Sequence, residues 1–149
     1  MLQRLRLDHV LKTGYTSLRC TWAAHCPVYL TPNLDAPHSM FGMDGEYARA
    51  WQKFFPGEAI PEEVGHPCCS QFAVSKAAIQ RRTRDDYLRY RDAIWNDPTD
   101  SMKVGHYMEY MWHVIFGKPA THCPEPAPCF CDLYGLCGSN DDDGIPGID

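Results

Sequence analysis

The sequence lacks a long apolar run and a strongly basic region. No stretch approaches the ~20 apolar residues that a membrane-spanning helix needs, and Met1–Arg6 has no uninterrupted apolar segment of the signal-peptide kind. The formal net charge is -5, and positive charge is concentrated only locally, at residues 81–84. The sequence therefore predicts no membrane span in this chain, and it lacks the electrostatic pattern that nucleic-acid binding requires.

Common catalytic motifs are absent as well. The chain contains no Gly-x-Gly-x-x-Gly, no Walker loop, no Gly-x-Ser-x-Gly and no His-Glu-x-x-His. These absences argue against the familiar dinucleotide-binding, P-loop, serine-hydrolase and zincin sites. The chain also has no internal repeat apart from the spacing of its cysteines.

The composition is that of a folded protein. Apolar residues make up 44% of the 149 residues, charged residues 22% and aromatic residues 12%, which distinguishes the chain from disordered segments. This length suits one hydrophobic core and is too short for two independent cores. We therefore expect a single domain, with residues 1–117 forming a core of helices and strands and residues 118–149 forming a cysteine-rich tail packed on it.

The eight cysteines are the most distinctive feature. They fall into three groups, which are Cys20 and Cys26, Cys68 and Cys69, and Cys123, Cys129, Cys131 and Cys137. Zinc sites favour Cys-x-x-Cys spacing, which the chain lacks, so disulfides are favoured over metal ligands or free thiols. Adjacent cysteines rarely bond each other, because a trans peptide holds their Cα atoms too close together. We therefore predict different distant partners for Cys68 and Cys69, and a protein of the secretory pathway or the extracellular space.

The sequence pattern predicts a mainly helical fold with a small sheet. Strands are expected at Tyr15–Trp22 and Ser70–Val74, and a surface loop at Pro27–Gly45, where Pro, Asn, Asp and Gly are frequent. The tail from Lys118 onward has no helical period, so disulfides are expected to organise it. The predicted class is α/β or α+β.

Five helices are predicted from apolar periodicity and cap residues. The first ends at Gly14, the second spans Glu46–Phe55, two more follow the N-caps Ser75 and Thr83, and the last ends before Gly117. The expected apolar faces are Leu2, Leu5, Val10 and Leu11 on the first helix, Tyr87, Tyr90, Arg91, Ile94 and Trp95 on the fourth, and Val104, Tyr107, Met108, Met111, Trp112 and Ile115 on the last.

Three polar residues of the last predicted helix are candidates for chemistry. His106, Glu109 and His113 lie at i, i+3 and i+7, on a face distinct from the apolar one. A carboxylate and an imidazole one turn apart can ligate a divalent ion together, or the imidazole can orient the carboxylate as a general base. The alternative is an ordinary polar helix face with an i, i+4 hydrogen bond.

Gln71 lies between the paired cysteines and an apolar strand. A buried amide at this position would need partners for its oxygen and both of its hydrogens, so it could bind a substrate hydroxyl or tie the strand end to a neighbouring backbone. His25, His66 and His122 each lie beside Cys or Pro in loops, and we predict that they are incidental to function.

Several segments resemble one known family. They are Gly14-Tyr15 with Leu18-Arg19-Cys20, Cys26-Pro27, Pro67-Cys68-Cys69-Ser70-Gln71-Phe72-Ala73-Val74-Ser75, Glu109-Tyr110-Met111-Trp112-His113-Val114-Ile115-Phe116-Gly117 and Cys123-Pro124. In order and content, over most of the chain, they resemble the fungal family of domain of unknown function 3431. That family is distantly similar to glycosyltransferases with the nucleotide-sugar (GT-A) fold, which are anchored in or pass through the secretory pathway.

The resemblance implies roles for particular residues. Gln71–Ser75 would line the acceptor side, and Glu109 and His113 would supply a catalytic base or, through His113, a metal ligand. Family members show Arg where this chain has His106, which favours the pair over a site of three residues. A divalent metal such as manganese would be the cofactor, and a glycan or a sugar nucleotide would be the partner.

Two functions are therefore expected from the sequence. The preferred one is a shortened glycosyltransferase-like protein with the C-terminal half of a GT-A-type fold, because family members carry a substantial N-terminal portion, with the sugar-nucleotide donor half, before the position of Gly14. The alternative is a non-catalytic, disulfide-stabilised secreted binding module. The first predicts a cleft lined by Gln71, Glu109 and His113, and the second predicts that these side chains are buried or scattered.

Overall fold

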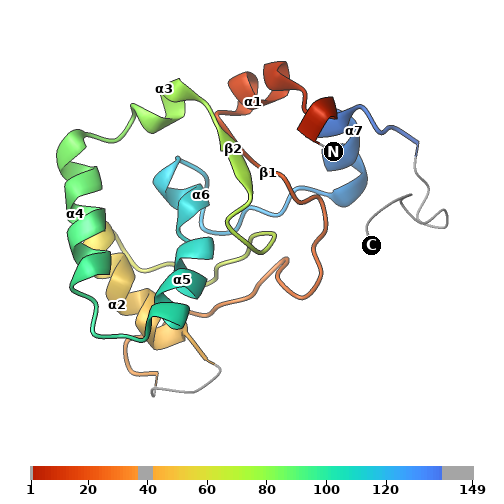
Figure 1. Cartoon of the computed structure of the whole chain (residues 1–149). Coiled ribbons are helices and arrows are strands. Elements are labelled where there is room, and N and C mark those ends of the chain that lie inside the picture. The colour runs from red at the N-terminus through yellow and green to blue at the C-terminus, as the bar shows by residue number, and fades with distance from the viewer. Residues whose placement is uncertain (1, 37–41, 139–149) are drawn as a thin grey trace.

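The computed structural model describes residues 2–36 and 42–138 (Figure 1). Within these residues the chain is mainly helical with one small antiparallel sheet, as the sequence predicts. The elements are η1 (Leu2–Arg4), α1 (Leu7–Thr13), β1 (Tyr15–Ser17), α2 (Asp44–Phe54), β2 (Phe72–Val74), α3 (Lys76–Ile79), α4 (Arg84–Trp95), α5 (Ser101–Glu109), α6 (Trp112–Ile115) and α7 (Pro126–Tyr134).

Two predicted helix starts are confirmed by their caps. The Ser75 hydroxyl accepts a hydrogen bond from the Ala78 N–H at the start of α3. At the start of α4, Thr83 and Asp86 form a capping box in which each side chain accepts from the other residue's backbone N–H. Such reciprocal bonds satisfy N–H groups that have no partner inside the helix.

Strands β1 and β2 lie between two groups of helices (Figure 1). Each strand has three residues and is shorter than predicted. An isolated bridge between Leu30 and Val64 and another between Gly65 and Thr121 join the neighbouring loops. The antiparallel register pairs Tyr15 with Val74, Thr16 with Ala73 and Ser17 with Phe72.

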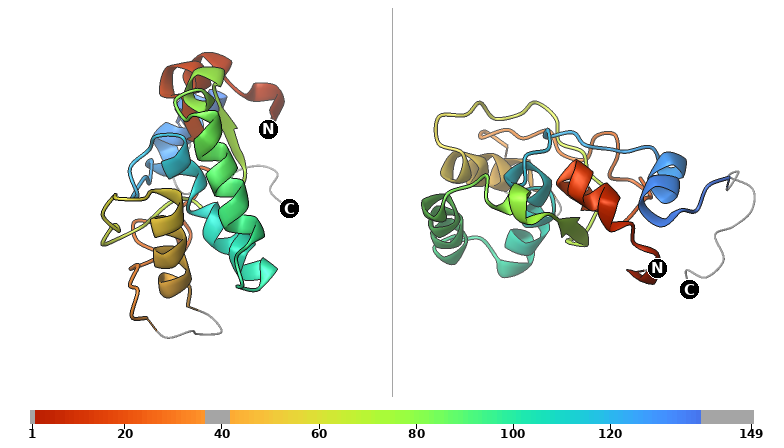
Figure 2. Two further views of the ribbon diagram at one scale, coloured as in Figure 1. Left: turned by 90° about the vertical axis from the view of Figure 1, so that its left-hand side faces the viewer. Right: turned by 90° about the horizontal axis from the view of Figure 1, so that it is seen from above.

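The larger core cluster lies among α2, α4, α5 and α6. Helices α2 and α4 run side by side (Figure 2), and Phe54 of α2 packs against Tyr90 of α4, with ring centroids 5.1 Å apart. The predicted face of α4 is wrong at its end, because Trp95 is 86% exposed and Arg91 is also exposed. The fully buried large side chains of this cluster include Tyr15, Tyr47, Phe54, Phe55, Tyr107, Tyr110, Met111 and Ile115.

The last predicted helix is two helices in the structure. Helix α5 ends at Glu109, two turn residues follow, and α6 begins at Trp112. The predicted apolar face is largely preserved, since Met108, Met111 and Ile115 are buried. The predicted polar face is not, because His113 is fully buried.

A second, smaller core cluster joins α1 to α7. Val10 of α1 packs with Phe130, Leu133 and Tyr134 of α7, and the two helices lie side by side in Figure 1. The prediction of a tail without helix is therefore wrong. Helix α7 begins with Pro126 in its first turn, where the missing N–H is not needed, and ends at Gly135 in the left-handed conformation (φ +70°).

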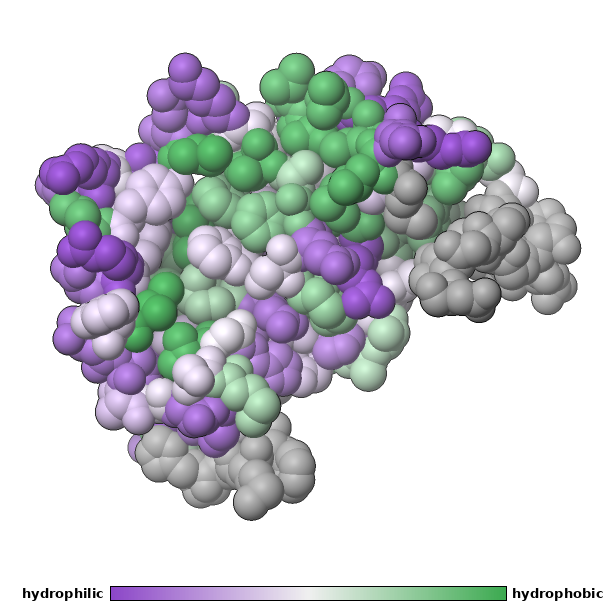
Figure 3. All heavy atoms as spheres, in the orientation of Figure 1, coloured by the Kyte–Doolittle hydropathy of each residue, from purple (hydrophilic) through white to green (hydrophobic). Residues whose placement is uncertain are grey.

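The first helix is less amphipathic than predicted. Val10 is its only buried residue among those described, and Leu7 and Leu11 are 66% and 71% exposed. Figure 3 shows apolar side chains gathered on the surface over α1. Gly14 ends the helix as predicted, at a φ of +79°.

All eight cysteines form disulfides, as predicted, but one pairing differs from expectation. Cys68 bonds the adjacent Cys69, with a Cα–Cα separation of 3.7 Å and a φ of +78° at Cys69. The prediction of distant partners is therefore wrong: the two sulfurs bond across a single peptide, with Cys69 at a positive φ that residues other than glycine rarely adopt. The other pairs are Cys20–Cys129, Cys26–Cys123 and Cys131–Cys137.

Candidate functional site

Several side chains that could bind a ligand or take part in catalysis meet at Cys68–Gln71, the segment that leads into β2. Glu109, the last residue of α5, accepts a hydrogen bond from the Cys69 N–H at 2.9 Å. From the chain after β1, the Arg19 guanidinium donates to both sulfurs of the Cys68–Cys69 disulfide, at 3.1 Å each. A carboxylate therefore contacts the backbone of the adjacent-cysteine disulfide, and a cation contacts both of its sulfurs.

Trp112 anchors the same segment from the start of α6. Its indole N–H donates to the Ser70 hydroxyl at 3.2 Å, and its ring stacks on Phe116 with an interplanar angle of 10°. The turn between α5 and α6 thus presents Glu109 and Trp112 to consecutive residues of the Cys68–Gln71 segment.

Gln71 is exposed rather than buried. Its backbone carbonyl accepts from the Leu18 N–H at 2.8 Å, which ties the segment to the end of β1. The predicted link between the strand end and a neighbouring backbone is therefore made by the main chain of Gln71. Its side-chain amide faces the solvent and stays a candidate for binding a hydroxyl.

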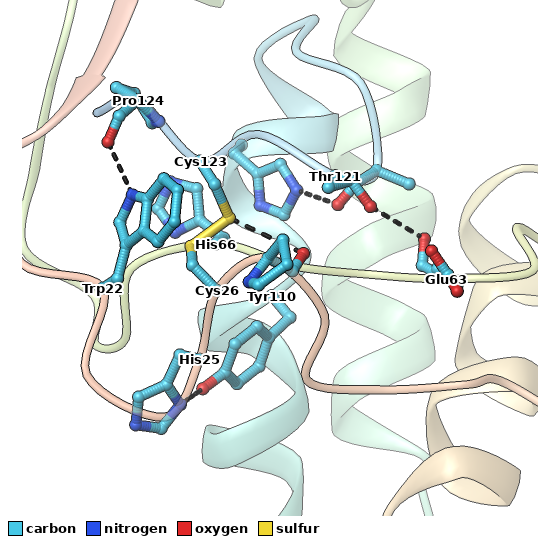
Figure 4. The surroundings of a disulfide bond; sticks show 12 residues. Trp22, His25, Cys26, Glu63, His66, Tyr110, Thr121, Cys123 and Pro124 are labelled. Atoms are coloured by element: carbon cyan, nitrogen blue, oxygen red, sulfur yellow. Dashed lines mark hydrogen bonds between the residues drawn. A yellow bond between two sulfur atoms is a disulfide. The ribbon is translucent and has the colours of Figure 1, made fainter.

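An array of aromatic rings and histidines lies beside Glu109. Tyr29 stacks on Tyr110 with centroids 4.7 Å apart, and its hydroxyl is 3.2 Å from Nε2 of His106. The Tyr110 hydroxyl bonds Nδ1 of His25, next to the Cys26–Cys123 disulfide (Figure 4). Burial lowers the pKa of His25, and the nearby Glu109 carboxylate partly opposes that shift.

His113 lies in the interior and not beside Glu109. Its Nε2–H donates to the Ala120 carbonyl at 2.9 Å, and its ring stacks on His66 with centroids 4.4 Å apart. Glu109 is bound at Cys69 instead. The structure therefore brings Glu109 to the Cys68–Gln71 segment and places His113 in a different, fully buried environment.

Sequence reasoning missed a buried histidine cluster. His66 is fully buried, stacks on His113 and lies 6.1 Å, centroid to centroid, from His122. Burial lowers the pKa of His66 and of His122 to about 4, and lowers that of His113 well below its usual value. His25, His66 and His122 were predicted to be incidental because each lies beside Cys or Pro in a loop. No periodic pattern marks such a residue as buried.

Within residues 2–36 and 42–138, no group of three or more His, Cys, Asp or Glu side chains is arranged to hold a metal ion. An open cavity of about 590 Å³ lies between α2 and α4, and none of the predicted site residues lines it. It is lined by Lys53, Asp85, Leu88, Arg89, Asp92 and Ala93.

Comparison with known proteins identifies one family. The model of the family described as Protein of unknown function (DUF3431) matches residues 1–132. No curated protein and no solved structure matches the chain. In the part of the chain that the structure describes, no helix has the length and apolar character to span a membrane.

Proposed function

The chain belongs to the family described as Protein of unknown function (DUF3431), and we propose that it is a disulfide-stabilised module that binds a glycan at the Cys68–Gln71 segment. Its four disulfides are compatible with a secreted or extracellular protein. On that ground we place it in the secretory pathway. Recognition of the glycan comes first in this proposal, and sugar transfer is a second candidate.

The observation that carries the proposal is the fixed carboxylate of Glu109. The Cys69 N–H holds one oxygen of this half-buried side chain, which leaves the carboxylate further capacity to accept hydrogen bonds from hydroxyl groups. The amide of Gln71 adds donors and an acceptor on the same segment. A sugar ring needs such partners around its edge.

The same segment offers apolar surface beside these polar groups. Trp112 is partly exposed, and its ring plane is set by the stack on Phe116 and the bond to Ser70. The partly exposed Cys68–Cys69 disulfide adds a small rigid apolar ring. An amphipathic aromatic side chain next to a few fixed polar groups is the usual composition of a small-molecule site.

The distribution of the predicted catalytic residues favours binding over catalysis by this chain. Gln71 is exposed, Glu109 is half-buried and His113 is fully buried. This scatter is what the hypothesis of a binding module predicts. The glycosyltransferase hypothesis predicts that the three side chains line one cleft.

A thermal-shift screen with soluble oligosaccharides tests the proposal. A ligand that binds only the folded state raises the melting temperature, and we expect a hit that Glu109→Gln weakens about tenfold. The matched control is Glu58→Gln, because Glu58 is exposed and lies just after α2, away from this segment. Equal loss of binding in both variants, or no hit among the oligosaccharides, would contradict glycan recognition at Glu109.

Sugar transfer is the second candidate, and the position of Glu109 supports it. A fixed, partly exposed carboxylate can accept a proton from an acceptor hydroxyl. Gln71 would then bind the acceptor, and His113 would ligate a divalent ion such as manganese only after its ring leaves the stack with His66. Titration with manganese and a panel of sugar nucleotides tests this candidate, and an unchanged melting temperature across the panel would overturn it for this chain.

A further inference from the structure

The Cys68–Cys69 disulfide differs from the other three in what it can stabilise. It joins adjacent residues, whereas Cys20–Cys129 and Cys26–Cys123 join residues 109 and 97 positions apart. A disulfide stabilises a fold mainly by lowering the conformational entropy of the unfolded chain, and the effect grows with the length of the loop that the bond closes. A bond between adjacent residues closes almost no loop and lowers that entropy very little, so the stability of the fold does not explain this disulfide.

The surroundings of this disulfide favour its reduction. Both cysteines are partly exposed, so a reductant can reach them. The Arg19 guanidinium lies 3.1 Å from each sulfur, and a neighbouring cation stabilises a thiolate relative to a thiol. A thiolate that is stabilised in this way is also a better leaving group in thiol–disulfide exchange.

We propose that Cys68 and Cys69 form a reversible redox site that exchanges with a dithiol reductant. A thiolate of the reductant attacks one sulfur, the Cys68–Cys69 bond breaks, and a mixed disulfide forms while the other cysteine leaves as a thiolate beside Arg19. The second thiol of the reductant then attacks the mixed disulfide and closes the reductant's own disulfide. The cysteine pair gains two electrons and two protons, and the reductant loses them.

Reduction would change the geometry around Glu109. Cys69 has a φ of +78°, a conformation that residues other than glycine rarely adopt. The eight-membered ring with Cys68 holds that conformation, and with it the Cys69 N–H that Glu109 accepts from. Once the ring opens, Cys69 can relax to a negative φ, and this hydrogen bond is lost. The redox state would thereby control how the carboxylate is presented.

Graded reduction of the intact protein, stopped by alkylation and mapped by mass spectrometry, tests the site directly. We expect alkylation at Cys68 and Cys69 at about tenfold less dithiothreitol than at the other six cysteines, with the far-ultraviolet circular dichroism unchanged. Alkylation of any of the other six cysteines at an equal or lower concentration would overturn the proposal. So would a non-reduced digest in which Cys68 and Cys69 are bonded to other residues.

Two further measurements separate a redox site from mere exposure. The alkylation rate of the reduced pair rises with pH, and in Arg19→Gln this rise should occur at a higher pH than in the wild type. The control Arg84→Gln, at the start of α4, should leave the pH profile unchanged. Hydrogen exchange at the Cys69 amide should increase on reduction, while α4 stays protected. Identical profiles in both variants, or an unchanged Cys69 amide, would contradict the proposal. The test needs no glycan, so its outcome is independent of the proposed function.

Discussion

His66 lies face to face on His113, with ring centroids 4.4 Å apart and ring planes 8° apart. Both rings are fully buried, and in each the Nδ1 atom has no hydrogen-bond partner among the described residues. Two imidazolium ions cannot share such a site without strong repulsion, and burial disfavours even one. The stack therefore requires neutral histidines.

This requirement makes stability depend on pH. The pKa of His66 and of His122 is about 4 in the folded protein and about 6.5 in an unfolded chain. Between these values the unfolded state binds more protons than the folded state, so the free energy of unfolding falls as the pH is lowered. The fall is about 1.4 kcal/mol per pH unit for each histidine that is protonated only in the unfolded state. Above pH ~6.5 both states are neutral at these rings and this contribution is constant. Urea unfolding at a series of pH values between 7.5 and 4.5 (about one unit apart) measures the slope.

Replacing His66 by a residue that does not titrate tests the origin of that slope. His66→Phe keeps an aromatic ring against His113 and removes one proton-binding site. Unfolding should then take up about one proton fewer, and the free energy of unfolding should depend less steeply on pH. Gln52→Ala, on the exposed side of α2, removes no titrating group; it serves as the control and should leave the slope of the wild type. An equally steep dependence in His66→Phe would exclude the stack as the cause.

Local signals predicted much of the fold, and packing decided the rest. Ser75 and Thr83 cap helices as predicted, because a cap depends on residues only a few positions away. The break after Glu109 was missed, because the apolar period of α5 continues through the turn into α6. The burial of His66 was missed for another reason: its partner His113 is distant in sequence, and neither loop position nor neighbouring residues encode that contact.

The candidate site was likewise predicted only in part. Glu109 was predicted as a functional residue, and the structure places it at the Cys68–Gln71 segment, which includes the predicted residue Gln71. The contribution of Arg19 was not predicted, since its role depends on the bond between Cys68 and Cys69. That bond joins adjacent cysteines, a pairing that the sequence analysis predicted against.

The disulfides should differ in their contribution to stability according to the loops that they close. Replacing Cys26 and Cys123 together by serine removes a bond between residues 97 positions apart, and should lower the free energy of unfolding by about 4 to 5 kcal/mol. The same change at Cys131 and Cys137, 6 positions apart, should lower it by about 2 kcal/mol. Denaturant unfolding of the two double variants gives the comparison, and a reversed order would contradict this account.

Two glycines should respond to alanine in opposite directions. A Cβ atom at Gly65 would lie 1.8 Å from the Pro27 carbonyl oxygen, so the backbone must move and Gly65→Ala should destabilise the fold by about 2 kcal/mol or more. A Cβ at Gly105, inside α5, meets no neighbouring atom within 4 Å. Gly105→Ala should therefore stabilise the fold by up to about 1 kcal/mol. If the melting temperatures of both variants shift in the same direction, the close approach of Gly65 to the Pro27 carbonyl is contradicted.

Residue-level mapping of the bound glycan tests the central claim most directly. We would titrate the ¹⁵N-labelled protein with the oligosaccharide that gives the largest thermal shift, and follow backbone and indole N–H signals. The account predicts the largest changes at the Cys69, Ser70 and Gln71 amides and at the Trp112 indole. Changes confined to the cavity between α2 and α4, near Lys53 and Arg89, would contradict a glycan site at the Cys68–Gln71 segment.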